Sequence, residues 1–362
     1  MAMKRPAASA SLGLDGAQLP SAGPCAKRGC STSASVGRPE LVVRLLNGTF
    51  GALVESDPPL TPTQVLRADV GAEMKAIWHR AGGILILRGL SALTPEELVA
   101  FSAHFGEVEQ ALTGGRAHAK LPGVPVLRLG NVQDAEGNLI SVPSSSAALL
   151  PPDGCCQYRP EDRQPVWHTD GCHRRRKPIG SAFFCRAAPA EGAQTCFADA
   201  AAGWASLSPD EQERLEGLEC ICSLAHHDRT IQLRRPEYPT LTPEQRAANP
   251  PQRVPLALVH PATGRKALYG FNTSTCCVVP KGTPCDQASL DRYDLEGLED
   301  PSVGIVRDLL PRFTAPPFTV VWKWREGDLV VWDNRATLHT GSGYDENKYV
   351  REMWRTTILP EE

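Results

Sequence analysis

The chain has 362 residues, a formal net charge of -3 and a hydrophobic content of 41%. That length suits one large domain or two ordinary ones, with enough apolar side chains for a sizeable core. The small negative charge gives no overall basic field that would attract nucleic acid or an anionic membrane. The most apolar stretch, "GGILILRG", is too short to span a bilayer and is expected to be a buried strand. These features permit a globular enzyme and argue against nucleic-acid and membrane partners.

The twelve cysteines show no paired CxxC spacing and lack the density of a small disulfide scaffold. Reduced thiols in an intracellular protein are therefore expected, with the cytoplasm as the preferred compartment. A zinc site is a second interpretation of one local cluster, although its spacing matches no structural zinc pattern. The cluster consists of Cys220, Cys222, His226 and His227.

Residues 1–39 are rich in Ala, Ser, Gly and Pro and contain Asp15 as their single acid. Such a composition cannot build a core, so a disordered tail is expected. Organelle transit peptides share this Arg- and Ser-rich, acid-poor composition, so plastid or mitochondrial import through residues 1–39 is the alternative. The predicted boundary leaves residues 40–362 as the folded domain.

Helices and strands are predicted from residue 41 onward. "LVVRLLNGTFGALV" has the composition of strands, and "VGAEMKAIWHRAG" places its apolar residues on one helical face. The two glycines that follow end this helix and lead into a buried strand at residues 84–87. A second helix is predicted in "SALTPEELVAFSAHFG", where Thr94 is the cap and Glu97 completes a capping box.

Beyond the second helix, short apolar runs alternate with Pro- and Gly-rich loops. The strand candidates are "VPVLRLGN", "GSAFFCRA", "VPLALVH", "FTVVWKW", "DLVVWDN" and "MWRTTIL". Two long polar segments, residues 134–165 and 226–254, lack periodicity and are expected to be lids or disordered loops. The pattern predicts a mainly β fold with flanking helices, as in a jelly roll.

The residues most suited to chemistry begin in "VWHTDG", where His168 and Asp170 lie two residues apart. Side chains two apart on a strand share a face, so both can reach one point. A second histidine, His339, lies at a predicted strand edge in "LVVWDNRATLHTG". Two histidines and one carboxylate on one side of an iron leave positions open for substrate and oxygen. A short HxD motif also occurs by chance, and a core histidine beside a surface aspartate is the competing interpretation.

Four longer segments bear on that choice. They are "ILILRGLSALTPEELVAFSAHFGE", "WHTDGCHRRRKPIGSAFFCRAAPAEGAQTCFADAAAGWASLSP", "VHPATGRKALYGFN" and "WKWREGDLVVWDNRATLHTGSGYDENKYVREMWRTTIL". In these segments the chain resembles the taurine dioxygenase and 2,4-dichlorophenoxyacetate dioxygenase family of iron(II)/2-oxoglutarate-dependent oxygenases. The last segment is the most specific, because its tryptophan, Asp-Asn-Arg, histidine and two arginines follow the family's order. The resemblance covers most of the chain after residue 40 and implies a double-stranded β-helix, the cupin-like jelly roll.

The resemblance also implies roles for individual side chains. His168, Asp170 and His339 would be the iron ligands. Thr195 and Arg351 would hold the distal carboxylate of 2-oxoglutarate. A guanidinium suits that role, because it binds a carboxylate through two parallel hydrogen bonds where a lysine offers only a point charge.

Arg355 is expected to face the same side of a strand as Arg351. The resemblance implies that Arg355 binds the anionic end of the substrate. The alternative is that Arg355 pairs with Asp333 or another structural carboxylate. The basic run at residues 174–177 is expected to be a solvated loop, with an entrance funnel for anionic substrates as the alternative. His260 aligns with the family and is expected to serve the fold.

Two departures from the family bear on the substrate. The family's Gly-Gly-Asp-Thr is Gly-Ala-Gln-Thr at residues 192–195, which keeps the threonine. Taurine-specific members place a histidine and a tyrosine shortly after the "FGE" motif, whereas this chain has "VEQALTG" at residues 108–114. The segment "LHTGSGYD" is closer to the aryloxyacetate branch. We therefore expect a small organic anion as substrate, either a carboxylate, an aryloxyacetate-like compound, or a sulfonate or sulfate.

The reaction implied by the resemblance uses iron(II), dioxygen and 2-oxoglutarate to hydroxylate a C–H bond, with release of succinate and carbon dioxide. The rival interpretation is a non-catalytic jelly-roll sensor that binds 2-oxoglutarate or a metal, and succinate formation would discriminate between them. A further rival is an interaction protein that works through residues 1–39. Assembly into a homo-oligomer is compatible with either.

Overall fold

The computed structural model describes residues 38–111, 119–142, 157–158, 167–233, 236 and 238–361. The tail or transit peptide predicted for residues 1–39 lies outside the described residues except for its last two positions. Most of the predicted loop at residues 134–165 also lies outside them. Within the described ranges, no helix has both the length and the apolar character needed to cross a bilayer.

The larger sheet has eight strands and is almost entirely antiparallel. Its neighbours run in the order β1-β2-β3-β14-β6-β16-β4, with β5 paired to β16 as well, and only β2 and β3 are parallel. The strands are β1 (Val42–Asn47), β2 (Phe50–Glu55), β3 (Ile84–Leu87), β4 (Glu107–Val108), β5 (Leu127–Gly130), β6 (Gly180–Ala187), β14 (Leu329–Asp333) and β16 (Glu352–Leu359).

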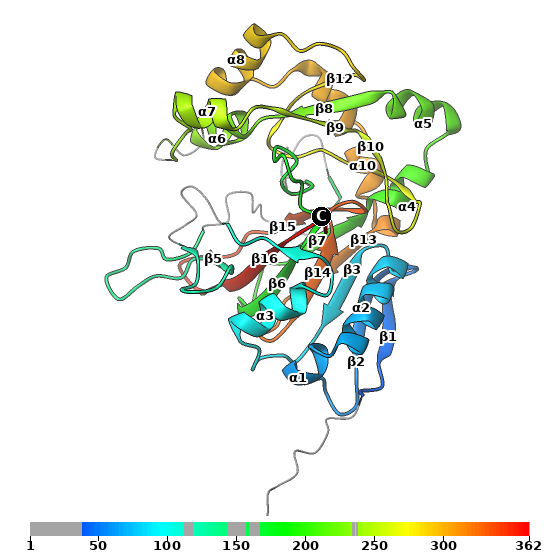
Figure 1. Cartoon of the computed structure of the whole chain (residues 1–362), viewed down its shortest axis with the longest axis vertical. Helices are drawn as coiled ribbons and strands as arrows, with labels where there is room; N and C mark the ends of the chain where they lie inside the picture. The colour runs from blue at the N-terminus through cyan, green and yellow to red at the C-terminus, as the bar shows by residue number, and fades with distance from the viewer. Residues whose placement is uncertain are drawn as a thin grey trace, which may run out of the picture. The chain divides into compact units, whose positions relative to one another are not determined.

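A smaller sheet faces the larger one and has the order β13-β7-β15. Its strands are β13 (Thr319–Trp322), β7 (Thr195–Asp199) and β15 (Thr337–Gly341). One buried cluster draws side chains from both sheets and fills the space between them. It includes Ile84, Ile86, Cys185, Phe197, Val320, Trp322, Trp324, Val330, Trp332 and Met353. Two facing, mainly antiparallel sheets around a common core confirm the predicted jelly roll (Figure 1).

Helices cover the outer face of the larger sheet, where α2 (Ala68–Arg80) packs on β3 and α3 (Pro95–Ser102) packs on β6 and β16 (Figure 1). A short helix, α1 (Pro62–Val65), precedes them. The predicted capping box of α3 is present, since the Thr94 hydroxyl accepts from the Glu97 N–H and the Glu97 carboxylate accepts from the Thr94 N–H. A second apolar cluster lies between these helices and the sheet.

A further layer is built from the long insert between β7 and β13. It holds the sheet β12-β8-β9 and the ribbon β10-β11. The strands are β8 (Leu218–Cys222), β9 (Gln252–Pro255), β10 (Ala257–Val259), β11 (Lys266–Leu268) and β12 (Thr275–Pro280). The helices are α4 (Ala200–Ala205), α5 (Pro209–Glu216), α6 (Leu224–Gln232), α7 (Pro243–Ala248), α8 (Gln287–Glu296), α9 (Gly304–Arg307) and α10 (Leu310–Phe313), with 3-10 turns η2 (Pro301–Val303) and η3 (Pro316–Phe318).

The prediction of one structureless loop at residues 226–254 is wrong. Most of α6, all of α7 and part of β9 fall inside it. Helix α7 begins with its own capping box, in which Thr242 and Gln245 each bond the other's backbone N–H. The helix buries no residue, so it has no apolar periodicity in the sequence to reveal it.

The expectation of reduced thiols holds for seven described cysteines and fails for Cys196, which is disulfide-bonded. The alternative zinc cluster does not form in the described part of the chain, where only two other groups bring three ligand atoms together. Cys222 donates instead to the Gly270 carbonyl, and the His226 Nδ1–H donates to the Tyr293 carbonyl at 2.9 Å.

Candidate functional site

His168 and His339 face each other across a single β-bridge. Each backbone N–H donates to the other residue's carbonyl at 3.0 Å, and the two ring centroids are 4.2 Å apart. His339 lies on β15 at the edge of the smaller sheet, as predicted. The strand predicted around "VWHTDG" is shorter than expected, because only His168 pairs and Asp170 already lies in a turn. Gly171, with a φ of 64°, allows that turn.

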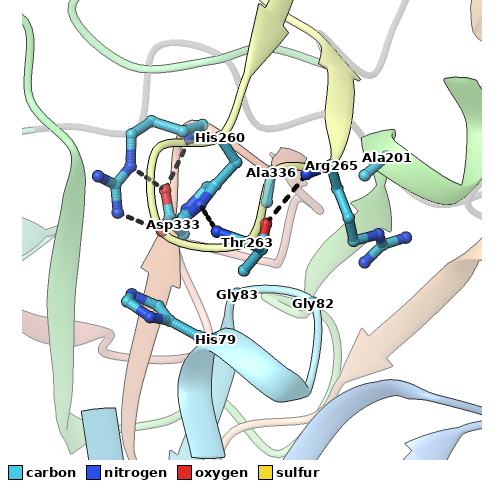
Figure 2. Close-up of a pocket in the computed structure, with 10 residues that line it drawn as sticks. His79, Gly82, Gly83, Ala201, His260, Thr263, Arg265, Asp333 and Ala336 are labelled. Carbon is cyan, nitrogen blue, oxygen red and sulfur yellow. Dashed lines mark hydrogen bonds and ion pairs between the residues drawn. The ribbon is translucent and has the colours of Figure 1, made fainter. Parts of the chain in front are cut away.

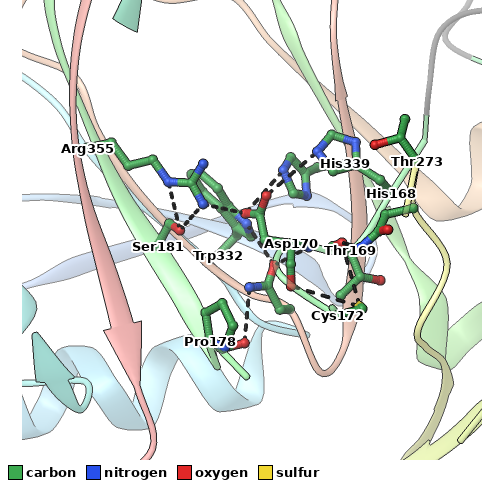
Figure 3. Close-up of polar contacts among 12 residues, drawn as sticks. His168, Thr169, Asp170, Cys172, Pro178, Ser181, Thr273, Trp332, His339 and Arg355 are labelled. Carbon is green, nitrogen blue, oxygen red and sulfur yellow. Dashed lines mark hydrogen bonds and ion pairs between the residues drawn. The ribbon is translucent and has the colours of Figure 1, made fainter. Parts of the chain in front are cut away.

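Asp170 lies between the two imidazoles. Its Oδ1 is 3.7 Å from the His168 Nε2, and its Oδ2 is 3.6 Å from the His339 Nε2 (Figure 3). One ligand atom from each of the three residues lies within 4.8 Å of the other two. Bonds of about 2 Å to nitrogen and oxygen ligands would let one ion reach all three, so the cluster fits a metal.

Burial keeps His339 in the form that binds metals. Loss of solvation, reinforced by the neighbouring His168, lowers the pKa of His339 to about 3. The imidazole is therefore neutral at physiological pH and offers a lone pair rather than a positive charge.

Arg355 holds the carboxylate from the other side. Its Nη2 donates to the Asp170 Oδ2 at 2.9 Å, and its Nη2 and Nε both donate to the Ser181 Oγ, at 2.9 and 3.2 Å (Figure 3). The guanidinium lies over the rings of Phe183 and Trp332, 5.6 and 5.8 Å from their centroids. The carboxylate partner of Arg355 is thus Asp170, one of the candidate metal ligands.

Arg351 is buried directly before β16, with 8% of its surface exposed. Its backbone N–H donates to the Asn131 Oδ1 at 2.8 Å. No carboxylate of the described residues forms an ion pair with its guanidinium, and burial lowers its pKa. Its charge acts on Cys185, which belongs to the core between the sheets. A buried cation without a counter-ion is costly, so this position suits a ligand that carries a negative charge.

Thr195 begins β7 and is also buried, with 6% of its surface exposed. Its Oγ1 accepts a hydrogen bond from the Trp324 Nε1 at 2.9 Å. It shares a strand face with Phe197, whose ring lies 6.4 Å from that of His339. The hydroxyl therefore lies on the face of β7 that turns toward the core between the sheets, and the charge of Arg351 acts on Cys185 of the same core.

A second cluster of three ligand atoms comes from His79, His260 and Asp333 (Figure 2). The His260 Nδ1 accepts from two backbone N–H groups at 3.2 Å, which places the ring hydrogen on Nε2, 2.9 Å from the Asp333 Oδ2. Arg335 donates to both oxygens of Asp333, at 2.8 and 2.6 Å. Because donors already occupy the His260 Nδ1 and both oxygens of Asp333, these residues and Arg335 form an ion-pair network that fixes the turn before β15, and His79 stays outside it with no partner for its Nε2 among the described residues. The expectation that His260 serves the fold is confirmed.

The basic run at residues 174–177 is partly neutralised. Arg174 pairs with Glu109, and Arg176 pairs with Glu107. Two of the four cations are therefore engaged, which weakens the alternative of an entrance funnel.

Comparison with known proteins gives the family. The family model described as taurine catabolism dioxygenase TauD, TfdA family, matches residues 43–357. The chain belongs to the TauD/TfdA family. Its relatives include an alpha-ketoglutarate-dependent 2,4-dichlorophenoxyacetate dioxygenase of Burkholderia sp. (strain RASC), 28% identical over 301 residues that cover 83% of this chain and 87% of the relative. Another is an (S)-phenoxypropionate/alpha-ketoglutarate-dioxygenase of Sphingobium herbicidovorans, 24% identical over 88% of this chain and 95% of the relative.

A third relative is the pentalenolactone F synthase of Streptomyces arenae. It is 28% identical over a stretch that covers 75% of this chain and 81% of the synthase. Solved structures support the fold. AAD-2 in complex with Mn(II) and N-oxalylglycine superposes with a TM-score of 0.63 at 21% identity, over 89% of this chain and 98% of that one. A putative 2,4-D dioxygenase from Burkholderia xenovorans gives a TM-score of 0.63 at 23% identity, over 88% and 97% of the two chains.

Membership in the TauD/TfdA family makes the protein an alpha-ketoglutarate-dependent dioxygenase, which is an oxidoreductase. Enzymes of this kind use 2-oxoglutarate and dioxygen together with a metal. The predictions of family, fold and enzyme class are confirmed, and the rival of a non-catalytic sensor is set aside.

Proposed function

We propose that the protein is an iron(II)- and 2-oxoglutarate-dependent dioxygenase that hydroxylates a small organic anion and releases succinate and carbon dioxide. The observation that carries the proposal is the cluster of His168, Asp170 and His339, with one ligand atom each within 4.8 Å of the others. Two histidines and one carboxylate on one side of an ion are typical of non-haem iron(II) oxygenases. These three residues would hold the iron.

The co-substrate has a matching pair of groups. Arg351 offers a buried guanidinium that pairs with no carboxylate among the described residues, and Thr195 offers a buried hydroxyl. The distal carboxylate of 2-oxoglutarate would supply the missing negative charge and accept hydrogen bonds from both. The support for this assignment is that a buried positive charge and a buried hydroxyl match a ligand with a negative carboxylate.

When bound, the iron supplies the oxidative chemistry that consumes 2-oxoglutarate and dioxygen. The chain's own residues prepare the site for it. Arg355 holds the Oδ2 of Asp170, which orients the carboxylate between the two imidazoles. The aromatic rings of Phe197, Trp332 and Phe183 lie beside His339 and Arg355 and keep water away from them. A dry, oriented site limits side reactions.

The proposed substrate is a carboxylate, most closely an aryloxyalkanoate, with a sulfonate or sulfate as an outcome of the screen. The named substrates of two relatives, 2,4-dichlorophenoxyacetate and (S)-phenoxypropionate, are aryloxy acids. The positive charge of the Arg355 guanidinium, which lies beside Asp170, suits a substrate that carries a negative charge. The absence from the sequence of the histidine and tyrosine of taurine-specific members argues against taurine.

We assign the catalytic domain to residues 40–362, supported by the family match at 43–357. The disordered tail, the import alternative for residues 1–39, the cytoplasmic location and a homo-oligomer stay predictions.

The test is succinate release from 2-oxoglutarate in a screen of small organic acids under air with iron(II). We expect His168→Ala and Asp170→Ala to lose turnover and iron binding. His79→Gln, which alters a histidine of the other cluster, is the matched control and should keep both. Turnover in both ligand variants at the wild-type rate would remove the metal from this site.

A further inference from the structure

Two tryptophans after Val321 have similar burial but different hydrogen bonding. Trp322 and Trp324 are 7% and 5% exposed and line the same surface pocket with Arg88 and Lys323. The indole N–H of Trp324 donates to the Thr195 Oγ1 at 2.9 Å. The indole N–H of Trp322 has no partner in the described ranges of the chain. The two rings also have different neighbours, since Arg88 lies over Trp322 and Phe183 lies beside Trp324, but only Trp324 makes an indole hydrogen bond among the described residues.

The bond from Trp324 determines what the Thr195 hydroxyl can still do. A hydroxyl has one hydrogen and two lone pairs, whereas an indole N–H can only donate. The indole therefore occupies a lone pair and leaves the hydroxyl hydrogen to be donated elsewhere. Among the described residues, no acceptor receives that hydrogen. With Thr195 almost fully buried, solvent satisfies it poorly, and a buried donor without an acceptor costs free energy.

An anionic oxygen is the acceptor that this arrangement suits. Without the indole, the hydroxyl would rotate freely, and donation to an incoming carboxylate would cost the entropy of fixing that rotation. With the indole in place, one lone pair is taken and the hydrogen must point away from the indole, where it can meet the ligand. Arg351 then supplies charge, and Thr195 supplies a directed neutral donor.

We propose that Trp324 is a positioning residue for the co-substrate: its indole N–H orients the Thr195 hydroxyl so that the hydroxyl hydrogen is donated to the distal carboxylate of 2-oxoglutarate. The inference rests on the proposed function, since it takes that carboxylate as the ligand. Trp324 itself does not touch the co-substrate. Its effect is confined to affinity for a keto acid that carries the distal carboxylate.

The experiment compares Trp324→Phe with Trp322→Phe, which removes an indole N–H of similar burial that holds nothing in the described structure. Binding of 2-oxoglutarate to the iron(II) protein is measured without oxygen. We expect the Kd to rise roughly 3- to 10-fold in Trp324→Phe, the loss of about one hydrogen bond, and less than about twofold in Trp322→Phe. The KM for 2-oxoglutarate should rise in parallel, while the KM for the prime substrate stays within about twofold of wild type.

Two further measurements separate positioning from general damage. The affinity for 2-oxobutyrate, which lacks the distal carboxylate, should be the same in Trp324→Phe and wild type. Trp324→Phe added to Thr195→Val should raise the Kd no further than Thr195→Val alone, because the two groups act as one unit. Equal effects of the two phenylalanine variants, an equal loss of 2-oxobutyrate affinity, or additive effects in the double variant would each overturn the proposal.

A spectroscopic measurement covers the case in which Trp324→Phe does not fold. In the zinc(II)-loaded protein, the indole N–H resonance displaced most by Thr195→Val should also be displaced when 2-oxoglutarate binds the wild type. An unchanged resonance would contradict the proposal. Failure of the proposed function is distinct, because the wild type would then bind no 2-oxoglutarate at all.

Discussion

Replacing Arg351 with methionine should separate stability from function. Arg351 is 8% exposed, its pKa is lowered by burial, and no described carboxylate pairs with it. Methionine has a similar length and no charge. The protein without ligands should therefore become more stable, by about 1 to 2 kcal/mol, since an uncompensated buried charge is removed. The free energy of unfolding from urea titrations measures this change.

The same substitution should damage co-substrate binding. Two charge-assisted hydrogen bonds of about 1.5 to 3 kcal/mol each would be lost, so the Kd for 2-oxoglutarate should rise roughly 100-fold or more. Arg351→Lys keeps the charge but loses the planar guanidinium that makes two parallel hydrogen bonds, and should raise the Kd for 2-oxoglutarate about 10-fold or more. At 100 times the wild-type Kd, 2-oxoglutarate should stabilise the wild type by about 2.7 kcal/mol, whereas the same concentration should stabilise Arg351→Met by about 0.4 kcal/mol or less.

Two outcomes would refute this reasoning. An apo Arg351→Met protein that unfolds at lower urea than wild type would show that the guanidinium already contributes stabilising contacts. An unchanged Kd for 2-oxoglutarate in Arg351→Met would remove Arg351 from the co-substrate site.

Three other perturbations have defined expectations. Asp333→Asn should lower the free energy of unfolding by about 3 kcal/mol, measured in urea, because it removes the buried carboxylate that pairs with Arg335 and His260. A change under 1 kcal/mol would contradict this. Arg355→Ala should weaken iron(II) binding about 10-fold, because the Asp170 Oδ2 loses its hydrogen-bond donor. It should also raise the KM for the prime substrate. An unchanged affinity for iron(II) in a calorimetric titration would contradict the first effect. Burial holds the pKa of His226 below its usual 6.5, so the folded state resists protonation of this ring. The contribution of His226 to the free energy of unfolding should therefore be full above pH 6.5 and decline as the pH falls below it. His226→Gln should flatten that decline between pH 7.5 and 5.5 in urea titrations, and an identical decline in both proteins would contradict it.

Local signals in the sequence predicted much of the fold. The strand at Ile84–Leu87 and the helix at Pro95–Ser102 follow from an apolar run and a capping box, which act within a few residues. Helix α7 was missed although its capping box is equally clear, because it buries no side chain. A helix on the surface needs no apolar periodicity, so the pattern of apolar residues does not reveal α7.

The site was predicted unevenly for a physical reason. The types and order of the ligand residues are visible in the chain, and the structure brings His168, Asp170 and His339 together. The hydrogen-bond partners of the residues around the ligands depend on strand register between segments that are far apart in the sequence. Ser181 lies 174 residues before Arg355, and Thr195 lies 129 residues before Trp324. Neither pairing has a local signal, because a hydroxyl or an indole can serve many partners.

The contact between Arg355 and Asp170 changes the interpretation of that arginine. The sequence offered a substrate cation or a structural ion pair as alternatives. The structure shows Arg355 bonded to a candidate metal ligand, so its positive charge lies beside the candidate metal site. An arginine in this position would link the orientation of Asp170 to the presence of substrate.

The most direct test of the central claim is an anaerobic titration of the protein with iron(II) and 2-oxoglutarate, followed by the weak visible charge-transfer absorption of a keto acid chelated to iron(II). We predict the band in the wild type and its loss in Asp170→Ala, with His79→Gln unchanged. A wild-type protein without the band, or a band of equal strength in Asp170→Ala, would contradict the assignment of His168, Asp170 and His339 as the metal centre.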